Sequence, residues 1–175
     1  VDHLHSWAPK WYFDAFGKSI PKISHFVFDW YKISIEIRDC STSSVLQKLN
    51  WGHLIIDEGQ DFSPEMYKCF MRVIRHKGLK GSKSAPSISV FADDNQTINN
   101  TNSSISDLIE ELNCSIKQKR LWRLVKNYRN SSEIASFSRY FQVRGAGAAQ
   151  LPQYENGMKP TVFLFEELCL NKFIN

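Results

Sequence analysis

Apolar and polar residues alternate in short blocks through the middle of the chain, and these blocks predict strands and helices in turn. Leu54, Ile55 and Ile56 form an apolar run that is typical of a strand buried on both faces, which we place at residues 53–57. The run SISVF predicts a second strand at 87–91. Each strand leads directly into a cluster of polar residues.

Helix signals follow both predicted strands. After the first, Ser63 and Pro64 suit the cap and first turn of a helix that continues until Gly78. Its apolar positions recur at helical spacing: Tyr67, Phe70, Met71 and Ile74. After the second strand, Ser104 can cap a helix whose apolar face carries Ile105, Leu108, Ile109 and Leu112.

The two ends of the chain carry weaker patterns. Residues 1–38 are rich in aromatic side chains and only loosely periodic, and we expect helices there. Asn130 and Glu133 have capping-box spacing before a further helix with Ile134, Phe137 and Phe141 on its apolar stripe. Residues 143–160 have the composition of a linker, and TVFLF at 161–165 predicts one more strand.

Strands that alternate with helices predict an α/β fold with a parallel sheet, which places its functional site at the carboxyl ends of the strands. The polar clusters occur at these ends. Asp57, Glu58 and Asp61 follow the first strand, and Asp93 and Gln96 follow the second. Ionised groups beside an apolar core cost desolvation unless they meet a cation or a hydrogen-bond donor. The pattern therefore implies a metal ion, phosphate-bound magnesium or an arginine at this edge.

Composition narrows the class of protein. The 175 residues, 42% of them apolar, suffice for one good-sized domain, or one domain and part of another. The net charge is +4, and residues 117–144 hold eight basic residues against Glu133 alone. Such a stretch fits contact with phosphates, and it fits a solvated basic face equally well.

Cysteine spacing and hydropathy bear on the setting of the protein. The four cysteines form no C-x-x-C pair and the five histidines no H-E-x-x-H, so neither a structural zinc site nor a disulfide framework is indicated, and we expect a reducing, cytoplasmic setting. No apolar run approaches the roughly 20 residues that span a bilayer, so we expect no membrane association. Because the chain begins at Val1, we expect it to be an excerpt of a longer protein.

Three short patterns occur in order with helices between them: L-I-I-D-E-G-Q-D at 54–61, F-A-D-D-N-Q-T-I at 91–98 and N-Y-R at 127–129. Together they resemble the UvrD/Rep family of superfamily-one DNA helicases, whose motors contain two RecA-like domains. The resemblance covers most of residues 50–142. It implies the latter part of a first RecA-like domain at 1–116 and the beginning of a second at 117–175. It also implies ATP and Mg²⁺ as cofactors, and single-stranded or partly duplex DNA as the partner.

The resemblance assigns a role to each matching residue. Asp57 would hold the magnesium ion, and Glu58 would orient the attacking water. Gln60 and Asp93 would lie beside the nucleotide, and Gln96 would sense the γ-phosphate. Arg129 would reach the same phosphate from the second domain. Phosphoryl transfer needs just these elements: a metal, a group that positions water, and a cation for the developing charge.

Other segments match the family less well. HLHSW at 3–7 is similar to its T-F-H-S-W element, which implies DNA contacts for His5, Ser6 and Trp7, although His3 replaces threonine and Leu4 an aromatic residue. Ala92 replaces the usual glycine and Asp94 a common proline. About 50 residues separate HLHSW from the Asp57–Glu58 pair, so the inserted subdomain of the larger helicases is expected to be reduced or absent.

The phosphate-binding loop of such a motor is not found in these residues. GKS at 17–19 lacks the glycine that G-x-x-x-x-G-K-[ST] requires at position 12, where Tyr12 stands, and we expect no strand before it. We expect the true loop before Val1 and the later motifs of the family after Asn175, so the chain alone should not hydrolyse ATP.

Two other functions remain open from the residues alone. A metal-dependent nuclease could use Asp57, Glu58, Asp61, Asp93 and Asp94 around two metal ions, but it leaves Gln96 and Arg129 unexplained. An inactive nucleic-acid-binding relic of the helicase fold is the third possibility. Asp61 could cap the helix at 64 or lie beside the nucleotide.

One geometric expectation separates these interpretations. If the helicase interpretation is correct, the strands at 53–57 and 87–91 are parallel neighbours. Asp57 and Gln96 then leave the same edge of the sheet, on loops within roughly 10 Å of each other.

Overall fold

The computed structural model describes residues 2–79, 85–97, 102–118, 120–142, 150–154 and 157. The chain forms two compact units, Val1–Trp122 and Arg123–Asn175, which are described separately. The expected boundary between two RecA-like domains, after residue 116, stays a prediction. No helix in the described ranges is long and apolar enough to cross a membrane.

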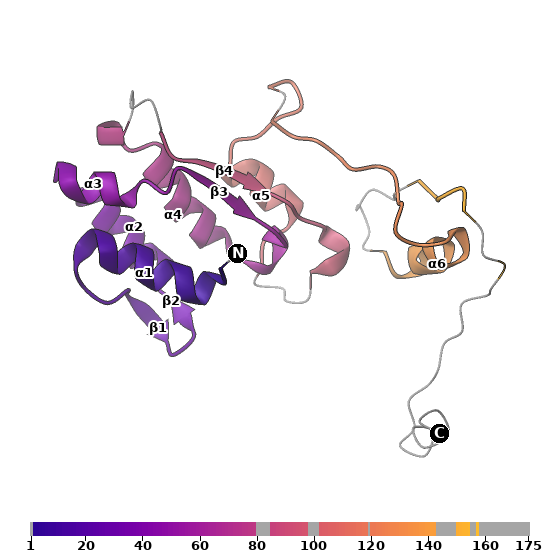
Figure 1. Ribbon diagram of the computed structural model, residues 1–175, viewed down its shortest axis with the longest axis horizontal. Helices are drawn as coiled ribbons and strands as arrows, with labels where there is room; N and C mark the ends of the chain where they lie inside the picture. Colours follow the sequence, from indigo (N-terminus) through magenta and orange to yellow (C-terminus); the bar gives the residue numbers. More distant parts are fainter. Residues whose placement is uncertain are drawn as a thin grey trace, which may run out of the picture. The chain divides into compact units, whose positions relative to one another are not determined.

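The first unit is a mixed α/β structure (Figure 1). Its helices are α1 (Leu4–Phe16), α2 (Trp30–Asp39), α3 (Ser43–Leu49), α4 (Pro64–Ile74) and α5 (Ile105–Glu111). Its strands are β1 (Lys22–Ser24), β2 (Val27–Phe28), β3 (His53–Ile56) and β4 (Ser87–Val90). Single turns of 3₁₀ helix form η1 (Gly59–Asp61), η2 (Lys77–Leu79) and η3 (Asp94–Gln96).

The strands β3 and β4 are the two that the apolar runs predict, and they pair in parallel, as expected. His53 lies opposite Ser87 and Ile56 opposite Val90. The pairing continues past both strands, because the Phe91 amide donates to the Ile56 carbonyl at 2.9 Å. The carboxyl ends of the two strands therefore lie at the same edge of the sheet.

The expectation that the first strand is buried on both faces is wrong. Leu54 and Ile56 face the core with Ile88 and Val90, whereas the side chain of Ile55 is 64% exposed and that of Phe91 55% exposed. A short apolar run specifies a strand but not how many layers cover it. Among the described elements, helices pack on one face of this sheet only (Figure 1).

An aromatic cluster fills the core beneath the sheet. Phe70 of α4 is fully buried, and its ring lies 5.2 to 6.2 Å from four indole rings, those of Trp7, Trp11, Trp30 and Trp51. The Trp51 indole N–H also donates to the Ser87 carbonyl at 2.9 Å, which fixes the start of β3 beside β4. Of the aromatic residues at the beginning of the chain, Trp7, Trp11, Tyr12, Phe28 and Trp30 thus belong to the core, whereas Phe13, Phe26 and Tyr31 are exposed.

The first 38 residues also contain a feature that the sequence does not predict. A small antiparallel hairpin, β1–β2, connects α1 to α2. Its strands are only two and three residues long and mostly exposed, so they lack the apolar alternation that marks a strand. Gly17 ends α1 in the left-handed conformation at φ 68°, with its N–H on the Phe13 carbonyl. A helix therefore precedes GKS, whereas a phosphate-binding loop follows a strand. This agrees with the rejection of GKS as such a loop.

Of the three helix N-caps predicted from the sequence, two are confirmed. Ser63 precedes α4 with Pro64 in its first turn, although α4 ends at Ile74, before the expected Gly78. Ser104 and Asp107 form a reciprocal capping box at α5. In the second unit, α6 (Ser132–Ser138) begins after Ser131, not after Asn130, so that expected cap is wrong.

The displaced cap in the second unit has a local cause. The backbone amides of Arg129 and Asn130 both donate to the Asn127 side chain, so residues 127–130 form a turn before the helix begins. Glu133 accepts the Gly157 N–H at 2.8 Å, and with Ser131 as the cap it is the second helical residue, whereas a capping box needs the third. The strand expected at 161–165 and most of the linker expected at 143–160 lie outside the described residues.

Candidate functional site

Two loops leave the carboxyl edge of the β3–β4 sheet and touch each other. The first holds Asp57, Glu58 and η1, and the second holds Asp93 and η3. The Gly59 amide donates to the Phe91 carbonyl at 2.7 Å, well within the expected 10 Å. The geometric expectation is confirmed: the strands are parallel neighbours, and Asp57 and Gln96 follow them at the same edge.

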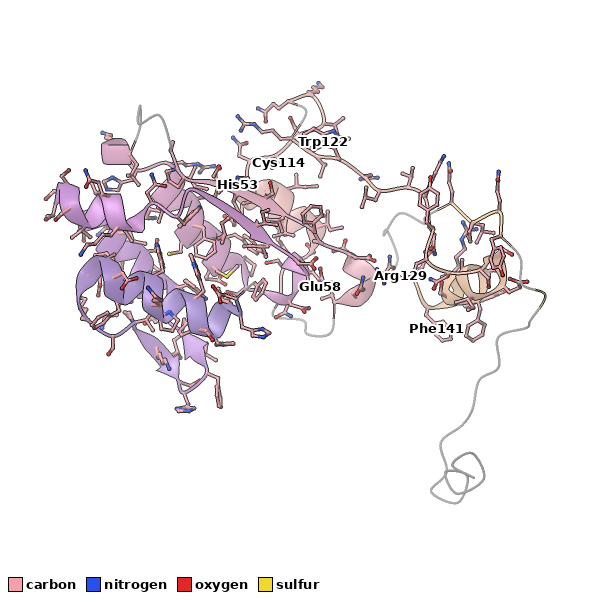
Figure 2. The ribbon with its side chains drawn as sticks, viewed as in Figure 1. His53, Glu58, Cys114, Trp122, Arg129 and Phe141 are labelled. Atoms are coloured by element: carbon pink, nitrogen blue, oxygen red, sulfur yellow. The ribbon has the colours of Figure 1, made fainter. Side chains whose placement is uncertain are left out.

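Glu58 has an unusual backbone conformation. Its φ of 51° and ψ of 46° lie in the left-handed region, which costs a non-glycine residue about 1–2 kcal/mol. Such outliers persist where surrounding contacts hold them, and they are frequent at functional sites. Figure 2 shows Glu58 at the carboxyl end of β3, at the opposite end from His53. The sharp turn lifts the Glu58 side chain out of the strand direction.

Gln60 joins the two loops from inside. Its side chain is only 1% exposed, its amide nitrogen donates to Glu58 Oε2 at 2.8 Å, and its amide oxygen accepts the Asp93 backbone N–H at 3.0 Å. A buried amide with both ends bonded holds its partners in place, because breaking either bond leaves a buried polar group unsatisfied. Gln60 thus positions Glu58 and the Asp93 loop. Its expected place beside the nucleotide stays a prediction.

Gly59 allows the close approach of the two loops. A Cβ atom at this position would lie 2.2 Å from Val90 Cγ1 and 3.2 Å from the Phe91 carbonyl oxygen. The Gly59 carbonyl accepts a hydrogen bond from the Tyr67 hydroxyl at 2.6 Å. Burial first, and then the nearby charge of Asp61, raise the pKa of Tyr67 above its ordinary range, so this hydroxyl keeps its proton and donates.

The second loop is organised by its own carboxylates. Asp93 Oδ1 accepts from the backbone and side chain of Asn95, and Oδ2 accepts from the Gln96 amide at 3.3 Å. Asp94 Oδ1 accepts the Ile105 N–H at 2.7 Å and so connects the loop to the first turn of α5. Gln96 is exposed, and Asp93 is its hydrogen-bond partner. Asp93 therefore orients Gln96.

The carboxylates of the first loop lack cationic partners. Within the described ranges, Asp57, Glu58 and Asp61 form no ion pair, and Asp57 accepts only the Glu58 N–H, at 3.0 Å. Asp61 does not cap α4, since Ser63 occupies the cap position. The three carboxylates are exposed, and the donors described for Asp57 and Glu58 are neutral, so these groups can receive a cation from solution.

The donor set suits magnesium better than a metal cluster. Among the residues described, no three His, Cys, Asp or Glu side chains lie together in a group that could hold a metal ion. Magnesium keeps several waters and uses one or two carboxylates together with phosphate oxygens. Asp57 can supply one such carboxylate, whereas a two-metal nuclease needs several around one point.

The remaining predicted residues belong to α1 and to the second unit. His5, Ser6 and Trp7 lie in the first two turns of α1, where Trp7 stacks on Trp11 with ring centroids 5.4 Å apart. Because Trp7 belongs to the aromatic core, only His5 and Ser6 are exposed for DNA contact. Arg129 is an exposed residue of the second unit. These assignments stay predictions.

Sequence reasoning missed the supporting roles of Gly59 and Tyr67, and it considered Asp94 only as a metal ligand of the nuclease alternative and as a departure from the family pattern. Gly59 could have been suspected from its place between Glu58 and Gln60, because a glycine inside a polar cluster often marks a close backbone approach. Tyr67 was taken only as part of the apolar stripe of α4, and nothing in its spacing reveals the bond to Gly59.

Comparison of the chain with protein-family models, with curated proteins and with solved structures gave no significant match. A functional assignment therefore rests on the three motifs and on the geometry of the two loops.

Proposed function

We propose that this chain is part of an ATP-dependent DNA helicase or translocase motor and carries the hydrolytic edge of its nucleotide site on a RecA-like domain. The observation that supports the proposal is the juxtaposition of two motifs on neighbouring parallel strands, joined by the buried Gln60. Open α/β sheets bind ligands at this edge. A nucleotide there would lie beside Asp57 and Glu58 on one loop and Gln96 on the other.

Each residue then has a chemical task. Asp57 holds magnesium, which when bound neutralises phosphate charge. Glu58 accepts a hydrogen bond from the attacking water and orients it, and Gln60 keeps the Glu58 carboxylate in place. Gln96, oriented by Asp93, detects whether the γ-phosphate is present. Arg129 supplies positive charge for the transition state, a contribution worth about 10³–10⁵ in rate in enzymes of this kind.

The proposal concerns the protein in which this chain occurs together with a phosphate-binding loop. The 175 residues contain no G-x-x-x-x-G-K-[ST] pattern, and GKS at 17–19 belongs to the end of α1 and the segment after it. The nuclease alternative is disfavoured because its carboxylates do not gather into a metal-holding group among the described residues. The relic alternative is disfavoured because Asp57, Glu58, Gln96 and Arg129 are all present.

The test is Glu58→Gln in the protein with its phosphate-binding loop. The amide still accepts a hydrogen bond from Gln60 through its oxygen but cannot accept a proton from water, so ATP binding should persist while DNA-stimulated turnover falls about 10²–10⁴-fold. Binding is measured by anisotropy of a fluorescent ATP analogue and turnover by phosphate release. Glu110→Gln, the same change at an exposed site on α5, is the control. Normal turnover in Glu58→Gln would refute the assignment.

Cleavage of nucleic acid with magnesium but without nucleotide would support the nuclease. DNA binding without any ATP turnover in the unaltered protein would support the relic.

A further inference from the structure

A basic groove lies at the far end of α4 from the candidate nucleotide site. It is an open cavity of about 870 Å³ between α2, α3, α4 and η2. Five cationic side chains line it, together with a single carboxylate, that of Glu111. The cations are Arg38, Lys68, Arg72, Arg75 and Lys77. Four of them lie within residues 68–77, on α4 and just after it, and Arg38 comes from α2.

Two of the cations are paired with carboxylates, and three form no ion pair among the described residues, although the Asp39 carboxylate also interacts with the charge of Arg72. Arg38 makes two hydrogen bonds to Asp39, at 2.7 and 3.0 Å, and Lys68 lies 3.4 Å from Glu111. Arg72, Arg75 and Lys77 are exposed, and none of them forms an ion pair within the described part of the chain. The dipole of α4 favours a cation in its last turn, which accounts for Arg72. Arg75 and Lys77 follow the end of the helix and add to the same positive field.

The floor of the groove is apolar. Among the residues that line it, Leu46 is buried and Met71 is partly buried. A ligand that fits must carry repeated negative charges and also present flat apolar surface. A chain of nucleotides does both, because its phosphates recur along a backbone that a positively charged groove can follow, and its sugars and bases present carbon surface to Leu46 and Met71. An open groove also admits a long ligand whose ends extend beyond it.

We propose that this groove binds the backbone of a single-stranded nucleic acid, with Arg72, Arg75 and Lys77 as the phosphate contacts. The site is separate from the nucleotide edge, since Arg72 lies about 12 Å along the helix axis from Pro64 at the start of α4, and Arg75 and Lys77 follow farther along the chain. Binding in this groove needs neither ATP nor the carboxylates of the candidate nucleotide site. The proposal can therefore be tested independently of the proposed motor function.

The experiment uses the 175-residue chain without ATP or magnesium and a fluorescein-labelled thymidine oligonucleotide, followed by anisotropy. Arg72→Gln/Arg75→Gln should weaken binding about tenfold and reduce the slope of log K against log salt by about 1.4, for two lost contacts at about 0.7 each. The control Lys32→Gln/Lys48→Gln removes the same charge from exposed positions outside the groove and should change affinity less than twofold. Circular dichroism verifies the fold of both variants.

Three results would overturn the proposal. The unaltered chain could fail to bind the oligonucleotide, or the control pair could weaken binding as much as the groove pair, which would indicate net charge alone. Poly-glutamate could displace the oligonucleotide at an equal concentration of charges, which would indicate an acidic protein segment as the ligand.

Discussion

Gly59 is the position in the candidate site where a single methyl group has the largest expected effect. A Cβ there would meet Val90 Cγ1 at 2.2 Å, and the β3 and β4 loops would have to separate. Overpacking of this kind typically costs about 1–3 kcal/mol. We therefore expect Gly59→Ala to lower the free energy of unfolding by about that amount, measured by urea denaturation.

Replacement of the neighbouring Val90 by alanine provides the control for this prediction. In Gly59→Ala/Val90→Ala the added methyl group occupies the space that the valine side chain leaves. The loss in free energy of unfolding should therefore be smaller than the sum of the losses in the two single variants. Strict additivity of the two free-energy changes would show that the clash does not exist.

Arg129 gives a second prediction at the level of one residue. If it serves charge that develops in the transition state, Arg129→Ala should lower turnover about 10³-fold or more while changing ATP affinity much less. The measurement is kcat for phosphate release beside the dissociation constant of an ATP analogue. Arg139→Ala, another arginine of the second unit, is the control. A normal kcat in Arg129→Ala would make Arg129 an ordinary surface residue.

At the level of elements, the connection between α1 and α2 predicts a pH dependence. Glu36 of α2 accepts a hydrogen bond from Tyr12 of α1 and lies 2.9 Å from Lys18. Burial alone would raise the pKa of Glu36, but the hydrogen bonds from Tyr12 and Lys18 and the charges of Lys18 and Lys32 together lower it below its ordinary 4.5. In the window below 4.5 the unfolded chain therefore binds the proton more readily than the folded one.

The sign of the effect follows from that difference. Glu36 stabilises the fold above its unfolded pKa, and this contribution is lost as pH falls through the lower folded pKa. Urea midpoints measured from about pH 6 down to about pH 3 should therefore decrease less steeply for Glu36→Gln than for the unaltered chain. Lys18→Gln should weaken the dependence in part. Equal slopes in all three proteins would contradict it.

Elements also mark the limit of what the sequence could predict. Apolar runs and capping residues located β3, β4, α4 and α5, because these signals are local. The exposure of Ile55 could not be predicted, since it depends on which distant segments cover the sheet. In the site, the paired loops followed from the strand order, but the bridging bonds of Gln60 depend on a contact with Asp93, 33 residues away.

For the whole molecule, the missing phosphate loop leads to a prediction about activity. The 175-residue chain alone should release phosphate from ATP no faster than background, with or without single-stranded DNA, because it has no loop to hold the β- and γ-phosphates. The assay is phosphate release at high protein concentration. Turnover that disappears in Glu58→Gln would show that these residues suffice for hydrolysis.

The left-handed backbone at Glu58 also has a consequence for selection among variants. Glycine and asparagine occupy that conformation with less strain than glutamate. A saturation library at position 58, sorted only for folded and soluble chains, should therefore enrich glycine and asparagine. If the proposed motor function is correct, the same library in the protein with its phosphate-binding loop, sorted for DNA-dependent activity, should return glutamate. The residue that is enriched at position 58 would then depend on the selection: glycine or asparagine under selection for folding, and glutamate under selection for activity.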